Sequence, residues 1–250
     1  MPSDAEEPQA LPAAGREGKD VGLVQAMFDR VAPRYDLANT VLSFGRDAHW
    51  RRVAAAAADP VGALCLDVAA GTGRIAAELG GRGAASVVAL DLSSAMVAEG
   101  AARRIPRVAF VNGDALRLPF PDGIFDAVTI GFGLRNLPDP EAGLREFARV
   151  TRAGGRLVVL EFSHPTWPPF RRVYRDYLMR AVPGVAGIVA SDPRAYRYLA
   201  ESILLWPDQQ GLAGWVANNG WRNVRYRNLT GGIVAVHRAV RGATREAPSS

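Results

Sequence analysis

The stretch LCLDVAAGTGRIA, residues 64–76, decides the fold, because it predicts a buried strand that enters a glycine turn and then a helix. It fits the dinucleotide fingerprint G-x-G-x-x-G/A through Gly71, Gly73 and Ala76. Asp91 follows roughly 20 residues later, where that fingerprint has an acid that binds a ribose. The turn therefore predicts a site for a ligand built from adenosine, and it leaves open which one.

Apolar runs alternate with helical patterns on both sides of the turn, which predicts a parallel α/β sheet. We expect strands over residues 63–69, 86–92, 107–113, 125–132 and 155–162, and helices over 73–83, 93–104 and 139–154. Ser93 or Ser94 is expected to cap the second helix, and Gly154 with Gly155 to end the third.

The last third of the chain changes character. Two arginine-rich and aromatic segments, 169–184 and 193–207, are helical in pattern, and a helix over 208–220 follows. Two strands, 222–229 and 231–240, are joined so tightly that they predict an antiparallel hairpin. A parallel sheet that ends in such a hairpin is not the usual layout of a dinucleotide-dependent dehydrogenase.

Length and composition predict one folded unit over residues 21–240. The chain has 250 residues, 48% of them hydrophobic and 22% charged, as in soluble globular proteins. We expect a disordered leader (1–20), a helical cap (21–60), a helical insertion after the fifth strand (165–206) and a disordered tail (241–250). One cysteine, Cys65, and no apolar run of membrane-spanning length predict a cytoplasmic protein.

The charges near the glycine turn distinguish two adenosine ligands. NAD would place a pyrophosphate over the turn, whereas S-adenosylmethionine would place an ammonium and a carboxylate there. Asp67, four residues before Gly71, repels a pyrophosphate and suits an ammonium, although Arg74 partly offsets it. Asp114 follows the third strand. Its carboxylate can accept a hydrogen bond from the adenine amino group, or the residue can simply form a turn. Acids on three successive strands favour S-adenosylmethionine.

The chain resembles the quinone-biosynthesis C-methyltransferases. Three blocks carry the resemblance: 27–52, 129–136 with 149–165, and 196–212 with 228–238. The first block is similar to the family signature Y-D-x-x-N-x-x-x-S-x-G…W-R through Tyr35, Asp36, Asn39, Ser43, Gly45, Trp50 and Arg51. Together the blocks span nearly everything from Met27 to His237, which makes the resemblance far more specific than a glycine turn.

This resemblance implies the class I S-adenosylmethionine-dependent methyltransferase fold, which is Rossmann-like, with a seven-stranded, mainly parallel sheet and a C-terminal antiparallel hairpin. It implies C-methylation of a prenylated quinol, foremost demethylmenaquinol; a ubiquinone-pathway benzoquinol, or another phenol methylated by a paralogue, is the alternative. The expected donor-binding residues are Tyr35, Asp67, Gly71, Thr72, Gly73, Asp91, Leu92, Asp114, Ala115 and Gly131. The family commonly has serine at Gly131 and often an acid at Arg74, which leaves room for an altered substrate.

Methylation of a ring carbon requires an aligned donor and an acceptor ring made electron-rich by loss of a phenolic proton. Arg135 and Asn136 follow the fourth strand, at the edge of the sheet where ligands bind. We expect Arg135 to stabilise the oxyanion, or alternatively to pair with an acid such as Glu161 or Asp139, and Asn136 to orient the ring. The candidate bases are His164 and Asp36 acting with Tyr35. His164 could instead cap a carbonyl.

Partner predictions rest on charge and on residues 169–182. The net charge is +5, yet the arginines gather in one insertion and no RNA-binding module is present, so we expect no nucleic-acid partner. Apolar residues there share one helical face: Phe170, Val173, Tyr174, Tyr177, Leu178 and Ala181. The helix either covers the sheet or contacts an anionic membrane peripherally, on the inner face of the cell membrane. A homodimer is one possible oligomeric state, and no metal is expected.

Overall fold

The computed structural model describes residues 22, 40, 43–178 and 193–242. The expected leader, most of the helical cap before residue 43, and the tail after residue 242 lie outside the described residues.

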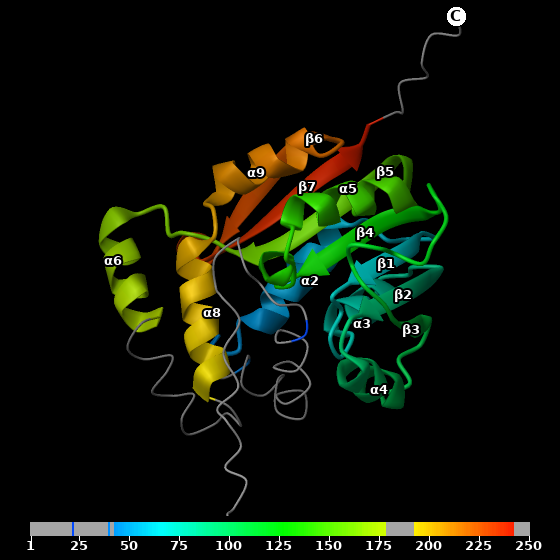
Figure 1. The fold of residues 1–250 in the computed structure, drawn as a ribbon, viewed down its shortest axis with the longest axis horizontal. Coiled ribbons are helices and arrows are strands. Elements are labelled where there is room, and N and C mark those ends of the chain that lie inside the picture. The colour runs from blue at the N-terminus through cyan, green and yellow to red at the C-terminus, as the bar shows by residue number, and fades with distance from the viewer. Residues whose placement is uncertain (1–21, 23–39, 41–42, 179–192, 243–250) are drawn as a thin grey trace, which may run out of the picture.

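A seven-stranded sheet forms the centre of the protein (Figure 1). Its strands lie in the order β3-β2-β1-β4-β5-β7-β6. β1 to β5 are parallel, and β7 pairs antiparallel with both β5 and β6. The predicted mainly parallel sheet with a C-terminal antiparallel hairpin is confirmed. The strand bounds are β1 Leu64–Val68, β2 Ser86–Asp91, β3 Val108–Asn112, β4 Phe125–Gly131, β5 Thr151–Phe162, β6 Trp221–Leu229 and β7 Val234–Arg241.

Helices cover both faces of the sheet, because alternate strand residues are apolar on each side. On one face Leu66 and Val128 pack in a core with α5 and α9, and on the other Cys65 and Ala127 pack with α2 and α3. Such two-sided burial is what a parallel sheet requires. The helices are α2 Asp47–Ala57, α3 Arg74–Gly81, α4 Ser94–Ala102, α5 Pro140–Val150, α6 Pro168–Asp176, α8 Pro193–Leu205 and α9 Gln209–Asn218.

Helix α4 begins as predicted, whereas α5 ends earlier than predicted. Ser93 caps α4, its hydroxyl accepting from the Met96 N–H. Helix α5 was expected to continue to Gly154, but it ends at Val150. Thr151 is already extended, and its hydroxyl donates to the carbonyl of Phe147 in the last helical turn (2.6 Å). The chain therefore passes directly from helix into β5, whose pairing with β4 shifts register at the start.

Helix α6 departs from the predicted apolar face. Tyr174 and Leu178 are buried and Phe170 is half-buried, but Val173 is 65% exposed. The buried side chains are spaced four residues apart, which leaves Val173 beside their stripe and open to solvent. Ala181 lies outside the described residues.

The strand order places the carboxyl ends of β1 and β4 at the point where the sheet changes direction. Connections from β1 lead to β2 and β3 on one side, and those from β4 lead to β5 on the other. Ligands of open α/β sheets bind at this edge, just beyond the strand ends. The fold therefore brings the glycine turn, Asp91 and the residues after β4 to one edge of the sheet.

Candidate active site

The glycine turn after β1 exposes backbone at one glycine and packs tightly at the other. Both Gly71 and Gly73 have positive φ, +56° and +82°. A Cβ at Gly73 would lie 2.5 Å from Cζ of Phe110, whereas a Cβ at Gly71 would have no atom within 4 Å. Gly73 is therefore required by packing against β3, while Gly71 leaves open space in which a ligand can approach the main chain.

Asp91 connects the glycine turn to the end of β2. Its Oδ2 accepts from the Gly71 N–H (2.7 Å) and its Oδ1 from the Ser93 N–H (2.9 Å). The side-chain amide of Asn112 donates to the carbonyls of Asp91 and Leu92, which fixes β2 to the end of β3. A half-buried carboxylate held in this way is oriented before a ligand binds.

Asp67 lies beneath the same turn and is almost fully buried. Its Oδ1 accepts from the hydroxyl of Thr129 on β4 (2.6 Å), and its Oδ2 accepts from the Ala76 N–H at the start of α3 (3.1 Å). Burial raises the pKa of the Asp67 carboxyl to about 7, and the hydrogen bond from Thr129 opposes that rise. The carboxyl can therefore change charge near neutral pH. Sequence reasoning missed Thr129, although a lone polar residue within the buried β4 run signals such a partner.

Asp114 lies just beyond β3 and has an exposed side chain. Its Oδ1 accepts from the Leu116 N–H (2.8 Å), a turn-forming contact, and a β-bridge joins it to Arg117. Ala115 and Thr72, the other predicted contacts in this region, are both buried. The turn-forming geometry and a role toward adenine are compatible, because the carboxylate remains open to solvent.

Gly131, at the end of β4, lies against the helix that follows the glycine turn. A Cβ there would approach Cδ1 of Ile75 to 2.3 Å. The serine that is common in the family at this position would therefore force Ile75 to move.

The structure places Arg135 in a buried ion pair with Glu161, one of the two pairings that the sequence left open. Its Nη1 donates to Glu161 Oε1 (2.8 Å) and to the carbonyl of Phe132 (2.7 Å), and its Nε to Ser202 Oγ (3.4 Å). The two side chains are 5% and 0% exposed. Asp139, the other candidate partner, instead caps α5.

Asn136 and His164 lie on neighbouring loops after β4 and β5. The side-chain carbonyl of Asn136 accepts from the hydroxyl of Tyr198 (3.5 Å), whose pKa is raised by burial. Nε2 of His164 lies 2.8 Å from the carbonyl of Trp206. Because a carbonyl only accepts, Nε2 must carry the proton, and Nδ1 has the lone pair that a base requires. Tyr35 and Asp36, the remaining candidates, lie outside the described residues.

A second charged contact joins the N-terminal block to the glycine turn. Asp47, at the start of α2, is buried, and its Oδ2 lies 2.5 Å from Nη1 of Arg74, the first residue of α3. The Ser43 hydroxyl donates to Oδ1 (3.2 Å), and Arg51 lies 3.7 Å from Oδ2. Arg74 is therefore a structural partner of Asp47, a role that sequence reasoning did not assign to it.

We expect the single variant Arg74→Asp to lower the free energy of unfolding by about 2–3 kcal/mol, because it places a second carboxylate against buried Asp47. The double variant Asp47→Arg/Arg74→Asp should recover part of this loss, since it restores an attractive pair but places a guanidinium beside Arg51. Thermal unfolding of the variants tests this expectation. A double variant no more stable than Arg74→Asp would contradict it.

The described residues contain neither a metal-binding cluster nor a membrane-spanning helix. Within residues 43–178 and 193–242, no three His, Cys, Asp or Glu side chains are arranged so as to hold a metal ion. No helix in these same ranges is both long enough and apolar enough to cross a bilayer.

The fold is that of S-adenosylmethionine-dependent methyltransferases. A Thermotoga maritima enzyme described by that term aligns with a TM-score of 0.63 at 19% identity, over 87% of this chain and 99% of its own. The Haemonchus contortus phosphoethanolamine N-methyltransferase 2 was solved with S-adenosylmethionine. It aligns with a TM-score of 0.54 at 14% identity, over 73% of this chain and 49% of its own.

The sequence places the chain more narrowly. Residues 15–241 match the model of the ubiE/COQ5 methyltransferase family, and the protein belongs to that family. Demethylmenaquinone methyltransferase of Mycolicibacterium vanbaalenii is 58% identical over 89% of this chain and 96% of its own length. The enzyme of the same name from Renibacterium salmoninarum is 55% identical over 90% of this chain and 94% of its own length. The predicted family is confirmed.

Proposed function

We propose that the protein transfers the methyl group of S-adenosylmethionine to a ring carbon of demethylmenaquinol. The observation that carries this proposal is the identity of 55–58% to two demethylmenaquinone methyltransferases, along nearly their whole length. Identity at that level, over nearly the whole length of each relative, supports the same substrate class.

The residues around the glycine turn suit S-adenosylmethionine, which supplies an electrophilic methyl group when bound. The open space at Gly71 admits the ligand, and Asp91 offers carboxylate oxygens to ribose hydroxyls. Asp67 lies within the low-dielectric interior beneath, where its negative charge attracts an ammonium and repels a pyrophosphate. Asp114, at the next strand end, accepts from the adenine amino group in this proposal. The charge of these acids favours the methyl donor over NAD.

For the acceptor, we propose that the residues after β4 and β5 activate and orient the ring. Asn136, fixed by Tyr198, orients it, and Arg135 stabilises the phenolate oxygen. Nδ1 of His164, with Nε2 bound to Trp206, is available to take the phenolic proton. Asp36 with Tyr35 is the competing proposal for the base. These assignments rest on position at the sheet edge and on hydrogen-bonding capacity.

Product analysis tests the proposed function directly. The purified protein is incubated with labelled S-adenosylmethionine and reduced demethylmenaquinone, beside a demethylated benzoquinol of equal prenyl length. We expect label in menaquinol and little in the methylated benzoquinol. Preferential labelling of the benzoquinol, or of neither quinol, would overturn the substrate assignment and favour the paralogue alternative.

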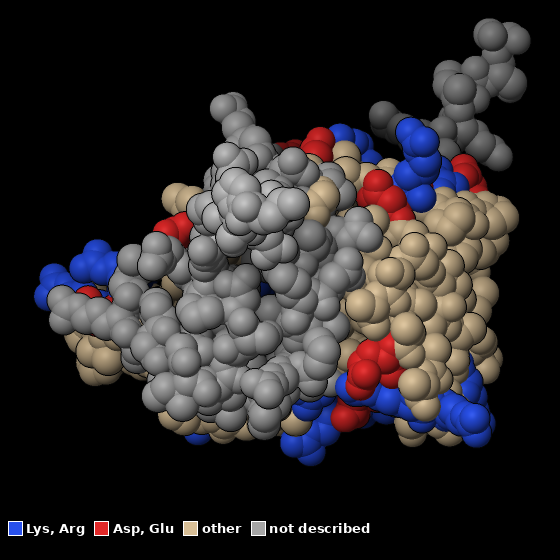
Figure 2. All heavy atoms as spheres, turned by 60° about the horizontal axis from the view of Figure 1, so that its bottom comes forward, with Lys and Arg blue, Asp and Glu red and all other residues tan. Residues whose placement is uncertain are grey.

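We also propose that α6 brings the enzyme to the membrane that dissolves its prenylated substrate. Arg171, Arg172 and Arg175 are exposed on this helix, beside exposed Trp167 (66%) and Val173 (65%). Basic side chains gather at the left end in Figure 2, the end where Figure 1 places α6. Exposed aromatic and aliphatic residues flanked by arginines are typical of interfacial helices.

We expect Arg172→Gln/Arg175→Gln to weaken binding to anionic vesicles by about 2 kcal/mol, roughly thirtyfold, because each arginine contributes about 1 kcal/mol near such a surface. Vesicle flotation with and without anionic lipid measures the effect. The matched control is Arg103→Gln/Arg104→Gln, which removes the same charge beside α4, at the other end of the sheet (Figure 1). Equal losses for both variants, or no lipid-dependent binding of the unmodified protein, would contradict an α6 membrane site.

A further inference from the structure

The segment between β3 and β4, residues 113–124, has little regular structure of its own. It carries Asp114, which the proposed function places at the adenine amino group, and the run Leu118-Pro119-Phe120. Leu118 is buried in the core, and the Phe120 ring packs edge-on against Phe125 at 5.1 Å. These contacts anchor side chains, and the main chain of the segment needs a separate support.

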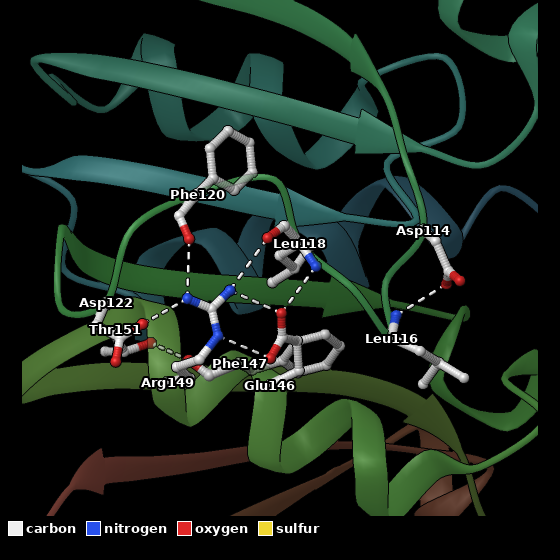
Figure 3. A network of polar contacts seen from close by, with 9 residues as sticks. All are labelled: Asp114, Leu116, Leu118, Phe120, Asp122, Glu146, Phe147, Arg149 and Thr151. Carbon is white, nitrogen blue, oxygen red and sulfur yellow. Dashed lines mark hydrogen bonds and ion pairs between the residues drawn. The ribbon is translucent and has the colours of Figure 1, made fainter.

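Arg149 of α5 provides that support, as Figure 3 shows. Its Nη1 donates to the carbonyl of Phe120 (2.9 Å), and its Nη2 donates to the carbonyl of Leu118 (3.1 Å). Nη1 also binds the carboxylate of Asp122 (2.6 Å). One guanidinium thus holds the segment at three points, all on the stretch that follows Asp114.

Glu146, one turn earlier on α5, completes the arrangement. Its Oε2 accepts from Nε of Arg149 (2.9 Å), and its Oε1 accepts from Nη2 (2.7 Å). The same Oε1 accepts from the Leu118 N–H (2.8 Å), so α5 binds both backbone polar groups of Leu118. The hydrogen bond from Arg149 lowers the pKa of Glu146, which therefore stays ionised at neutral pH.

The two side chains are 32% and 17% exposed, so solvent screens part of their attraction and their effect on global stability is modest. Their geometry matters more. A planar guanidinium with fixed N–H directions orients several acceptors at once, which a flexible ammonium does not. This favours a role in shaping the segment over a role in holding the fold together.

We infer that Arg149 and Glu146 are positioning residues for the methyl-donor site. They touch no donor themselves, and they fix the peptides of Leu118 and Phe120 so that the segment presents Asp114 to the adenine ring. The inference rests on the proposed function, because that function assigns this segment to the donor.

The experiment compares Arg149→Met, Arg149→Lys and Glu146→Gln with the unmodified protein. Calorimetric titration with S-adenosylhomocysteine gives Kd, and steady-state assays give kcat and both KM values. We expect Arg149→Met to raise Kd and the donor KM about tenfold, with kcat and the quinol KM changed less than twofold. Arg149→Lys should resemble Arg149→Met, since one ammonium cannot bridge the same acceptors. Glu146→Gln should have a smaller effect in the same direction.

Arg145→Met is the matched control on the same helix. Arg145 donates to the side-chain carbonyl of Asn219 (2.9 Å) and lies 3.8 Å from the carboxylate of Asp139, and both of these partners are outside the 113–124 segment. Its variant should leave Kd unchanged. A fall in melting temperature for Arg149→Met with an unchanged donor Kd would show a purely structural role and overturn the inference, as would full rescue by lysine.

The binding measurement needs no methyl acceptor, so it separates this inference from the proposed substrate. If demethylmenaquinol is not methylated but Arg149→Met still weakens nucleoside binding, the positioning role stands and the substrate assignment fails. If the unmodified protein does not bind S-adenosylhomocysteine, both fail.

Discussion

Replacing Arg135 with alanine is expected to lower the free energy of unfolding by about 3–5 kcal/mol, because it leaves Glu161 charged and buried without its partner. Turnover should fall at least about a hundredfold in addition, since removal of one donor to a developing oxyanion has that effect. Chemical denaturation measures the first quantity, and initial rates at saturating donor measure the second.

Loss of activity in that variant alone would not separate catalysis from folding. The double variant Arg135→Met/Glu161→Gln removes both charges. The single carbonyl oxygen of glutamine can accept from one of the two main-chain N–H groups, at positions 135 and 162, that Glu161 binds through separate oxygens. We expect this variant to recover much of the stability, because a neutral buried pair costs less than a single buried charge.

Turnover of the double variant then decides the role of Arg135. If stability returns and turnover stays low, with donor affinity unchanged, Arg135 stabilises the phenolate as proposed. If turnover returns together with stability, the ion pair only positions the turn after β4, and another group stabilises the oxyanion.

The layout of the sheet was predictable because its signals are local and repeated. The parallel strands are short apolar runs, and all except β3 are followed by a helical segment, as at residues 64–81. The boundary between α5 and β5 was not predictable in the same way. The residues 151–155 fit a helix end in sequence, and they join the sheet only because β4 lies beside them.

The site was predictable to the level of which strand ends carry acids, and not to the level of their contacts. Asp67, Asp91 and Asp114 could be predicted because they lie at or near the carboxyl ends of three strands. Their hydrogen-bond partners could not be predicted, because these partners are distant in the sequence. Thr129 donates to Asp67 from 62 residues away, and Asp126 accepts from the Leu64 N–H over a similar separation. Such pairs depend on strand order, which a single sequence does not state. Arg135 shows the same limit, since both Glu161 and Asp139 were reasonable partners until the fold placed one of them.

Asp67 is expected to make donor affinity depend on pH. Burial raises its pKa from 3.8 to about 7 in the folded protein, so the unliganded carboxyl is protonated below neutrality. Only the ionised form attracts the donor ammonium. We expect affinity for S-adenosylhomocysteine, which keeps this ammonium, to rise about tenfold per pH unit below pH 7 and to level off above it. Calorimetric titration between pH 5.5 and 8.5, spanning roughly 1.5 units on either side of that pKa, measures this.

Stability should change in the opposite direction. Because the folded pKa lies above the unfolded one, this carboxyl stabilises the unliganded protein below pH 4 and loses that contribution as pH rises through 7. Asp67→Asn removes the titration. Its amide can accept from the Ala76 N–H and donate to Thr129, whose hydroxyl then turns to the carbonyl of Leu66, 3.5 Å away.

The variant Asp67→Asn should therefore be more stable than the unmodified protein at pH 8 and should bind the nucleoside about thirtyfold more weakly there, with little pH dependence. The loss corresponds to roughly 2 kcal/mol, the attraction between unit charges about 8 Å apart at an effective dielectric constant of 20. His164→Gln is the control, because it removes the proposed base and leaves Asp67 unchanged. If His164→Gln abolishes the pH dependence and Asp67→Asn keeps it, the buried carboxylate does not attract the donor.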